Sequence, residues 1–597
     1  PSLVGSEMCI RDRVSTDITD VKQTLKYESE QPNSLYDPNG SFQSINRRYD
    51  IVYGDVMLNF NYNINRFDIA ATVGWTGRYE NMNNIRVSTN GGLVTENWFD
   101  LNASRYTPSS TLQRMELLKT GYMGTLSLGW DNYLFLELTG RQERSSTLKD
   151  QSFFYPSANL SFLFTQAFHM PSWWNYGKLR LSYGIVGNAP ETYTANIVYE
   201  QGSDNGFTWN TIPSSWGNAD IHPEKKYEYE IGLESKFLNN RLGIDISYYN
   251  NRVKDQILST PQPSTSGVKN VLMNVGEVAN RGWDISISAT PILTRDFRWD
   301  LTANYGVYKN KVVKLADGVP YLEILNSGGS GIKIQAVEGQ PMGDIYAQVP
   351  QVNENGEYLV SDKGLYLNQT ELQKVGNINP AGVGGLFNSF SYKNVFLDFS
   401  IDFRIGGDVI NEMNQYATAV GLTPESLKYR DTEHGGLSYY YPGDNNSSGI
   451  PVQVDPSTGA GPNGEIIYHD GIILPGVVAS TGERNTRIIP AGYYYNTTYN
   501  WGTEAEQLTY RHSVFDNSYV KLRELTIGYQ FPEKMISKLG LGRLSVSVFG
   551  RNLFYFYKAL KNYDAESSVG TSWANQATVG SSTTATRSFG VSLRASF

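Results

Sequence analysis

Long segments in which every second residue is apolar constrain the fold of this chain more than any other feature. In NVFLDFSIDFRIGG, residues 394–407, apolar residues from Leu397 to Ile405 alternate with polar residues from Asp398 to Arg404. A β-strand with this period places all its apolar side chains on one face and its charges on the other. The same pattern recurs in the segments 56–64, 67–76, 153–168, 176–188, 518–532, 543–558 and 585–597.

The length of these segments and the connections between them indicate the type of sheet. We expect roughly fifteen strands of about 10–16 residues, whereas strands of soluble sheets have about 5 or 6. Short turns are expected near residues 65, 131, 172, 239, 294, 394 and 536. Long polar segments lie between them, near 84–118, 188–226, 256–270, 316–380, 410–516 and 559–584. Regular alternation of short and long connections is typical of an outer-membrane barrel, with short periplasmic turns and long extracellular loops.

The apolar face of such strands is predicted to contact lipid, and the polar face to line a wet interior. Because backbone groups find no water in lipid, the sheet must close on itself, so we predict an all-β, transmembrane antiparallel β-barrel. The alternative is a soluble or secreted all-β protein with sheets packed face to face. Such packing would bury many charged side chains, which is costly.

Composition argues against several other functions. The net charge of −9 lacks the basic footprint of nucleic-acid binders. The five histidines form no HExxH pattern, no phosphate-binding Gly-Lys-Ser/Thr loop occurs, and the single Cys9 provides no thiolate metal site. We therefore predict no enzymatic activity and no cofactor. QVNENGEYLVSD (351–362) resembles a degenerate calcium loop, but it has too few carboxylates, so a hairpin turn is favoured over weak calcium binding.

The N-terminal segment differs from the rest of the chain. PSLVGSEMCIRDR, residues 1–13, has no strand alternation and resembles translated sequencing-adapter sequence, so we interpret it as a non-native leader. Residues 14–46 are predicted to be a loop or irregular. Residues 47–597 are predicted to form barrel strands.

Several ordered motifs resemble one family of barrels. DNSYVKLRELTIGYQFP (516–532), GRNLF (550–554) and NYDAES (562–567) follow LRLSYGIVGN (179–188), NVGEVANRGWDISI (274–287) and GVGGLFNSFSYKNVFLDFSI (382–401). Together they resemble the SusC/RagA family of TonB-dependent outer-membrane transporters. Ala565 stands where that family usually has proline, which questions the rigidity of this loop. In NVGEVANRGWDISI, Asn274 is expected to satisfy backbone groups freed at a bend beside Gly276.

The resemblance implies a barrel of about 22 strands, of which about 15 are present, without the plug domain and the TonB box. It implies import of oligosaccharides or peptides across the outer membrane of a Gram-negative bacterium, with a SusD-like lipoprotein as lid. Energy would come from TonB–ExbB–ExbD through the missing N-terminal region. The alternative is a passive porin or adhesin barrel.

Candidate binding residues come from loops and from one strand. Aromatic rings beside Asn and Asp suit sugars, so substrate contact is expected at Trp209, Trp216, Tyr440, Tyr494 and Trp501, with loop packing as the alternative. The inward polar side chains Asp398, Asp402 and Arg404 are expected to line the passage.

Overall fold

A computed structural model describes residues 6–29, 37–149, 152–204, 207–263, 265, 267–327, 331–443, 449–500, 509–567, 572–579 and 585–596. The chain divides into two compact units. Unit 1 comprises residues 1–235, 247–279 and 316–319, and unit 2 comprises 236–246, 280–315 and 320–597.

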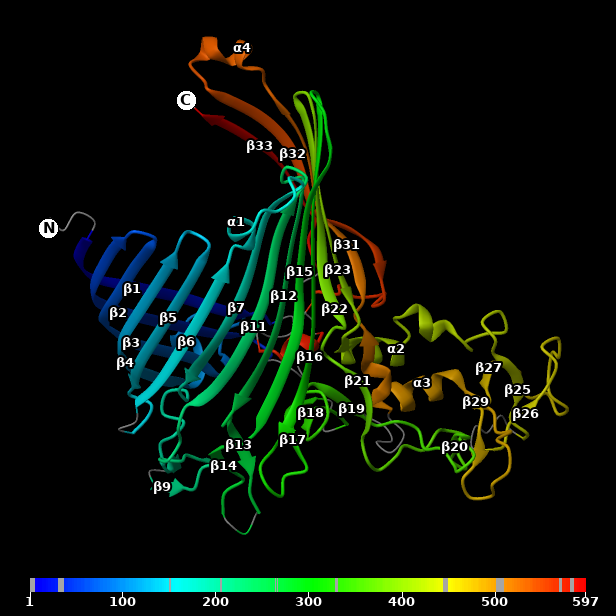
Figure 1. The fold of residues 1–597 in the computed structure, drawn as a ribbon. Helices are drawn as coiled ribbons and strands as arrows, with labels where there is room; N and C mark the ends of the chain where they lie inside the picture. The colour runs from blue at the N-terminus through cyan, green and yellow to red at the C-terminus, as the bar shows by residue number, and fades with distance from the viewer. Residues whose placement is uncertain are drawn as a thin grey trace. The chain divides into compact units, whose positions relative to one another are not determined.

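Within the described residues, sixteen strands form one sheet in the order β1-β2-β3-β4-β5-β6-β7-β11-β12-β15-β16-β22-β23-β31-β32-β33 (Figure 1). In unit 1 they are β1 Ser6–Tyr27, β2 Ser41–Ile64, β3 Phe67–Leu93, β4 Ser104–Trp130, β5 Leu134–Ser145, β6 Ser152–Phe162 and β7 Trp174–Asn188. In unit 2 they are β16 Phe297–Lys314, β22 Gly382–Tyr392, β23 Val395–Ile405, β31 Tyr519–Gln530, β32 Arg543–Lys558 and β33 Ser588–Ser596. Three strands have residues in both units: β11 Glu224–Phe237, β12 Leu242–Lys254 and β15 Glu277–Leu293.

Tight turns join neighbouring strands near residues 65, 131, 239, 294 and 394 as predicted, whereas the connections near 172 and 536 are longer and contain the short helices α1 Phe164–Ala167 and α4 Glu533–Ile536. Ile64 pairs with Phe67, which leaves Asn65 and Arg66 as a two-residue loop with Asn65 at a φ of 53°. Asp131 also has a positive φ, at the β4–β5 turn, and Lys393 does so at the β22–β23 turn. Asn and Asp adopt this left-handed conformation more readily than most residues, and it matches the twist of a hairpin. The predicted antiparallel hairpins are therefore confirmed at these turns.

Smaller elements fill the long connections. In unit 1 these are β8 Glu200–Asp204, β9 Phe207–Thr211, β10 Ser215–Trp216, β13 Ile257–Pro261 and β14 Asn270–Asn274. In unit 2 the small strands are β17 Tyr321–Ser327, β18 Ile332–Val337, β19 Asp344–Ala347, β20 Leu359–Val360, β21 Gln373–Asn377, β24 Asp408–Ile410, β25 Leu437–Tyr440, β26 Val452–Gln453, β27 Tyr468–Ile472, β28 Val477–Val478, β29 Ile489–Pro490 and β30 Val514–Asp516. The helices are α1 Phe164–Ala167, α2 Glu412–Ala419, α3 Ala491–Tyr499 and α4 Glu533–Ile536. No helix among the described residues is long and apolar enough to cross a membrane.

The small elements of unit 2 pack into what we call the loop assembly, defined as the described residues of 320–381, 406–518 and 559–579. Its largest buried cluster includes Ile332, Ile334 and Ile345 with Tyr510 and Val514. A second cluster gathers Leu365, Ile472, Leu474 and Ile489. The buried apolar clusters of unit 2 thus consist mainly of residues from connections rather than from the middle of the long strands.

Two segments predicted to be irregular are strands. Residues 14–46 were expected to form a loop, but β1 pairs with β2 from Ser6–Tyr62 to Tyr27–Ser41, and β2 already begins at Ser41. Likewise, most of the predicted loop 84–118 belongs to β3 and β4. Their alternation is interrupted: in β1, Met8, Ile10, Val14 and Ile18 lie on one exposed face, but Asp12 and Thr16 share that face, and Val21 and Leu25 lie on the other. The apolar face of β1 is thus discontinuous in the sequence, and backbone pairing with β2 extends along the whole strand, including the positions where that face is interrupted.

Candidate functional site

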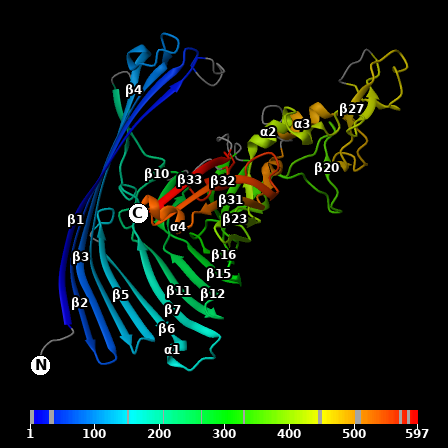
Figure 2. The ribbon, with the colours of Figure 1, turned by 90° about the horizontal axis from the view of Figure 1, so that it is seen from above.

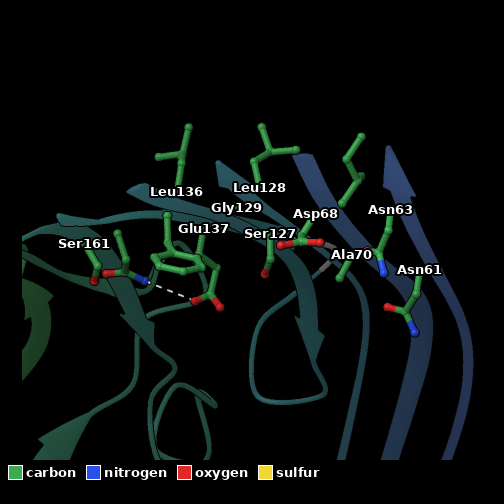
Figure 3. A pocket seen from close by; sticks show the side chains of 13 residues that line it. Asn61, Asn63, Asp68, Ala70, Ser127, Leu128, Gly129, Leu136, Glu137 and Ser161 are labelled. Carbon is green, nitrogen blue, oxygen red and sulfur yellow. Dashed lines mark hydrogen bonds between the residues drawn. The ribbon is translucent and has the colours of Figure 1, made fainter. Parts of the chain in front are cut away.

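The polar face of unit 1 forms a concave wall at the end of the sheet that carries the tight turns. Figure 3 shows this wall, which surrounds a cavity of about 600 Å³. Cross-strand pairing aligns its side chains in rows, one of which runs from Asn61 to Ala70, Ser127, Glu137 and Asn159. Because side chains alternate between faces, each of these five strands contributes its polar set to the same side.

The wall presents both hydrogen-bond donors and hydrogen-bond acceptors. The Asn159 side-chain amide donates to Glu137 Oε1 at 3.3 Å, and the Thr72 hydroxyl donates to Asn59 Oδ1 at 2.8 Å. Asp68 adds a carboxylate beside the cavity. Such a surface can hydrogen-bond water, a polar solute or another polypeptide. It is not suited to packing as an apolar core.

The opposite face of the same strands is apolar and exposed. Val73 of β3 is 55% exposed, and Phe60, Phe67, Trp75 and Tyr122 are exposed with it. Apolar side chains that alternate outward along many neighbouring strands form the lipid-facing band of a membrane barrel. This exposure fits the predicted division into an apolar outer face and a polar inner face.

In unit 2, β23 contains the three predicted passage-lining residues on one face. Asp398 accepts a hydrogen bond from the Ser389 hydroxyl at 2.6 Å, and Asp402 is ion-paired with Arg523. Arg404 instead donates to two backbone carbonyls, that of Ile378 at 3.0 Å and that of Gly406 at 3.2 Å. All three therefore share a face as predicted, and each one has an intramolecular partner.

A charged cluster, here called the ionic node, joins β23 and β31 to the segment that follows β32. Besides Asp402, Arg523 contacts both carboxylate oxygens of Glu566, at 2.8 and 2.5 Å. Lys521, only 1% exposed, donates to the same carboxylate at 2.6 Å. Arg523 also donates to Asn552 Oδ1 at 3.0 Å. The node places one guanidinium between two carboxylates, an arrangement that gives strong charge-assisted hydrogen bonds.

The node fixes the segment NYDAES, whose rigidity the sequence leaves open because of Ala565. The Ala565 carbonyl accepts from the Asn517 side-chain amide at 2.9 Å, and Asp564 accepts from the Tyr555 hydroxyl at 3.1 Å. With Glu566 held by the node, three consecutive residues have contacts outside their own segment. Proline is therefore not needed to fix this loop.

Sequence reasoning missed Lys521, Arg523 and Glu566. A β-bulge explains why: two residues of β31, Arg523 and Glu524, lie opposite the single Ser400 of β23. The bulge shifts the alternation, so simple counting misassigns these side chains. The signal was two basic residues in an otherwise alternating strand, with an acidic residue in the adjoining motif.

The aromatic loop residues of unit 1 remain accessible. Trp209 lies in β9, is 46% exposed, and covers Gly202 of the paired strand β8. Trp216 in β10 is half-buried and meets the Tyr199 ring edge-on at 5.8 Å between centroids. Trp209 therefore presents an open ring face, and Trp216 is partly engaged in loop packing.

The aromatic residues of the loop assembly are packed more tightly. Tyr494 in α3 lies against Tyr495 and Tyr499, at 5.2 and 6.1 Å between ring centroids, and its burial raises the pKa of its hydroxyl. Tyr499 stacks on His512 at 4.4 Å, and burial lowers the pKa of that imidazole to about 4. Tyr440 in β25 is half-buried, and Trp501 lies outside the described residues. The structure therefore places Tyr494 in loop packing, which was the alternative to substrate contact.

The possible calcium segment has the geometry of a turn. Val352 bridges Tyr358, the Asn353 N–H donates to the Glu357 carbonyl at 2.9 Å, and the Asn353 side chain caps the turn. The predicted hairpin turn is confirmed, while weak calcium binding stays a prediction. Among the described residues, no group of three His, Cys, Asp or Glu side chains is placed to hold a metal ion.

Comparison with known proteins identifies the family. The family model for the β-barrel of TonB-dependent receptor-like proteins matches residues 11–342, more than half of the 597 residues. The chain belongs to the TonB-dependent receptor β-barrel family. It is an outer-membrane protein of a Gram-negative bacterium, and its family consists of receptors rather than enzymes.

Relatives of this TonB-dependent receptor chain are longer than the chain itself. It is 24% identical to TonB-dependent receptor P3 of Formosa agariphila over 75% of this chain and 42% of the relative. It is 30% identical to TonB-dependent receptor SusC of Bacteroides thetaiotaomicron over 38% of this chain and 24% of SusC. The chain thus spans less than half the length of these curated relatives.

The fold matches solved transporters. The structure of the RagAB peptide transporter superposes with a TM-score of 0.67 at 18% identity, covering 95% of this chain and 58% of that chain. The predicted resemblance to SusC/RagA proteins is confirmed at the level of family and fold.

Proposed function

We propose that the complete protein imports oligosaccharides or peptides across the outer membrane and that this chain supplies the C-terminal part of its barrel. Import would be driven by TonB–ExbB–ExbD acting on a plug domain outside this chain. A SusD-like lipoprotein would close the extracellular side.

The observation that carries this proposal is the pairing of a polar inner wall with an exposed apolar face, in a chain of the TonB-dependent receptor family. An interior lined by Asn, Ser and Glu suits a hydrated passage, and a large barrel of this kind needs a plug. No covalent chemistry is required of the passage, because it has only to admit and release its cargo.

Both the loops and the relatives support oligosaccharides and peptides as cargo. The exposed ring of Trp209 can stack on the C–H face of a sugar or on a peptide side chain. Names among the relatives include SusC and a peptide transporter. We therefore keep both oligosaccharides and peptides as cargo, with loop residues such as Trp209 and Trp216 as contacts.

The test is uptake by intact cells that carry the complete gene or a deletion of it. Fluorescent oligosaccharides and peptides of about 5–10 residues are offered in parallel, with and without depletion of TonB. We expect the deletion to abolish accumulation of one class, and TonB depletion to have the same effect.

A passive porin or adhesin gives a different pattern. Uptake that depends on the gene but survives TonB depletion would indicate a porin, and no dependence on the gene would indicate an adhesin or an unrelated role. Either result contradicts the proposal.

A further inference from the structure

One edge of β4 has no neighbouring strand for much of its length. β4 pairs with β3 from Trp130 as far as Ser104, but it pairs with β5 only as far as Lys119–Ser145. Figure 2 shows β1 to β4 continuing side by side. Within the part of the chain that the structure describes, residues 105–117 of β4 therefore form an edge strand.

The backbone groups that face this edge can be assigned from two bonds. The Leu118 carbonyl accepts from the Ser146 N–H at 2.9 Å, and the Glu116 N–H donates to the Tyr193 hydroxyl at 3.0 Å, both on the β5 side. Backbone groups of successive residues in an antiparallel strand point to opposite edges. The same parity directs the N–H and C=O groups of Ser110, Leu112 and Arg114 toward the open edge.

The open stretch is bounded at both ends. On one side Pro108 has no N–H, and the Tyr106 carbonyl already accepts from the Ser104 hydroxyl at 2.6 Å. On the other side the Tyr193 hydroxyl occupies the Glu116 N–H. The five residues Ser110 to Arg114 thus form a window. Three of them, Ser110, Leu112 and Arg114, have edge-facing backbone groups without a hydrogen-bond partner among the described residues. The window can therefore pair with one short extended segment, but it is too short to support a long additional strand.

This window lies beyond the membrane in an outer-membrane barrel. Leu118 is twelve residues from Trp130, at the turn end of β4, which is about 41 Å along a strand. With a tilt of about 45°, this length already exceeds the apolar band of about 25 Å. Residues 105–117 therefore project into water on the side of the long loops.

A pocket adjoins the window at its Glu116 end. Tyr79, Glu116, Leu118 and Tyr193 are among the residues that line a cavity of about 410 Å³ there. A second cavity of about 450 Å³ shares the residues Ser146, Thr147, Ala195 and Asn196 with it. Segments that add to a sheet gain affinity from main-chain hydrogen bonds and specificity from pockets for single side chains. The window has both features.

The charges along the edge favour an acidic occupant. Between Ser104 and Leu118, β4 carries Arg105 and Arg114 against Glu116 alone. Arg114 is exposed, and it is not among the described residues that form ion pairs. A carboxylate placed opposite Arg114 would pair with it across the strands, whereas a like charge would be unfavourable.

We propose that the Ser110–Arg114 edge of β4 binds an extended acidic segment of a partner protein as an added β-strand, with one of its side chains in the adjoining pocket. The partner is recognised by backbone pairing and by Arg114. This surface is separate from the polar inner wall, and the inference does not depend on which cargo is imported.

The test uses the complete protein in detergent and nine-residue fluorescent peptides of alternating Thr and Val. One peptide carries a central Glu, a second carries Lys at the same position, and a third is the acidic peptide with N-methylated backbone donors. Leu112→Pro removes an N–H that faces the open edge rather than one that bonds to β3, and Pro108 already occupies an equivalent position in this strand. Leu112→Ala is the matched control, because it keeps the N–H.

We expect the acidic peptide to bind saturably to the wild type and to Leu112→Ala. The basic peptide should bind the wild type more weakly by on the order of tenfold, and the acidic peptide should bind Leu112→Pro more weakly by the same factor. The N-methylated peptide should not bind. Arg114→Glu should reverse the charge preference, which tests the site even where Leu112→Pro fails to fold.

Three results overturn the proposal: no saturable binding of the acidic peptide, equal binding to well-folded Leu112→Pro, and unchanged charge preference in Arg114→Glu. A fourth is a disulfide-linked dimer formed by Ser110→Cys in a Cys9→Ser background. It would show that a second copy of this chain occupies the edge.

Discussion

In unit 2, the long strands expose apolar residues, whereas the loop assembly buries them. In β23 and β31, the apolar side chains Val395, Ile405 and Ile527 are exposed. In the loop assembly, Ile334 and Ile345 are fully buried. The strands therefore rely on lipid to cover their apolar face, whereas the loop assembly has hydrophobic cores like those of a soluble domain. One chain thus folds against two solvents, and the two regions should respond differently to the same kind of substitution.

The largest effect is expected in the core of the loop assembly. Ile334→Ala removes buried methyl groups and leaves a cavity beside Ile332 and Tyr510, which should lower the free energy of unfolding of the loop assembly by about 2–5 kcal/mol. Limited proteolysis of the complete protein measures this as faster cleavage within 320–381 and 406–518. Heat-modifiable gel mobility, which reports the barrel, should stay unchanged. Loss of the barrel band would mean that the two regions do not fold separately.

A charge on the outer face should be the next largest effect. Val73→Lys places an ammonium group in the apolar band and should destabilise the inserted barrel by about 2–4 kcal/mol. Thr72→Lys, one residue away on the polar face, is the matched control and should cost less than about 1 kcal/mol. Urea unfolding in lipid vesicles measures both. Equal costs would contradict the assignment of one face to lipid and the other to water.

The ionic node connects the two regions compared here, and its loss should have an intermediate effect. Glu566→Gln leaves Lys521 as a buried cation without its carboxylate. This should destabilise the 559–567 segment by about 1–2 kcal/mol. The effect is smaller than for a fully buried ion pair because Glu566 is partly exposed. Hydrogen exchange of this segment measures the change. Glu483→Gln, an exposed carboxylate of the same assembly, should have no effect.

The node also predicts a pH dependence. Burial raises the pKa of Glu566, but hydrogen bonds from Arg523 and Lys521 outweigh it and lower the pKa below its ordinary value of 4.5. A depressed pKa stabilises the folded segment fully above pH 4.5, and this contribution is lost as the pH falls through the lower, folded value. Protection factors in 559–567, which correct for the slower intrinsic exchange at low pH, should therefore fall below about pH 4.5 in the wild type, and Glu566→Gln should show no such step. A step of equal size in both proteins would assign it to another group.

Local patterns in the sequence predicted the parts of the fold that depend on local physics. Alternation and turn residues located the hairpins at Asn65, Asp131 and Lys393. Asn274 was expected to satisfy backbone groups at a bend, and its amide donates to the carbonyls of His222 and Asp255. In β1 and in the extensions of β2 to β4, however, polar residues interrupt the alternation, so periodicity alone did not identify these segments as strands.

The site was harder to predict because its partners are distant in sequence. Arg523 meets Asp402 across 121 positions and Glu566 across 43, and a bulge changes the register between them. Tyr494 and Trp209 share the same sequence signature, an aromatic residue in a polar loop, yet α3 packs Tyr494 among other tyrosines while β9 exposes Trp209. Tertiary packing, which one sequence does not reveal, decides between the two outcomes.

The smallest effect on stability is expected at this exposed tryptophan. Trp209→Ala removes an exposed ring from unit 1, so the free energy of unfolding should change by no more than about 0.5 kcal/mol. If the ring contacts cargo, the concentration for half-maximal uptake should rise, because stacking is lost while the barrel is unchanged. Tyr494→Ala is the contrasting variant: its packing against Tyr495 and Tyr499 predicts faster proteolysis of the loop assembly. Unaltered uptake in well-folded Trp209→Ala would show that this residue is not part of the binding surface. If Trp209→Ala instead lost as much stability as Tyr494→Ala, exposure would not distinguish ligand-facing from packed aromatic residues in these loops.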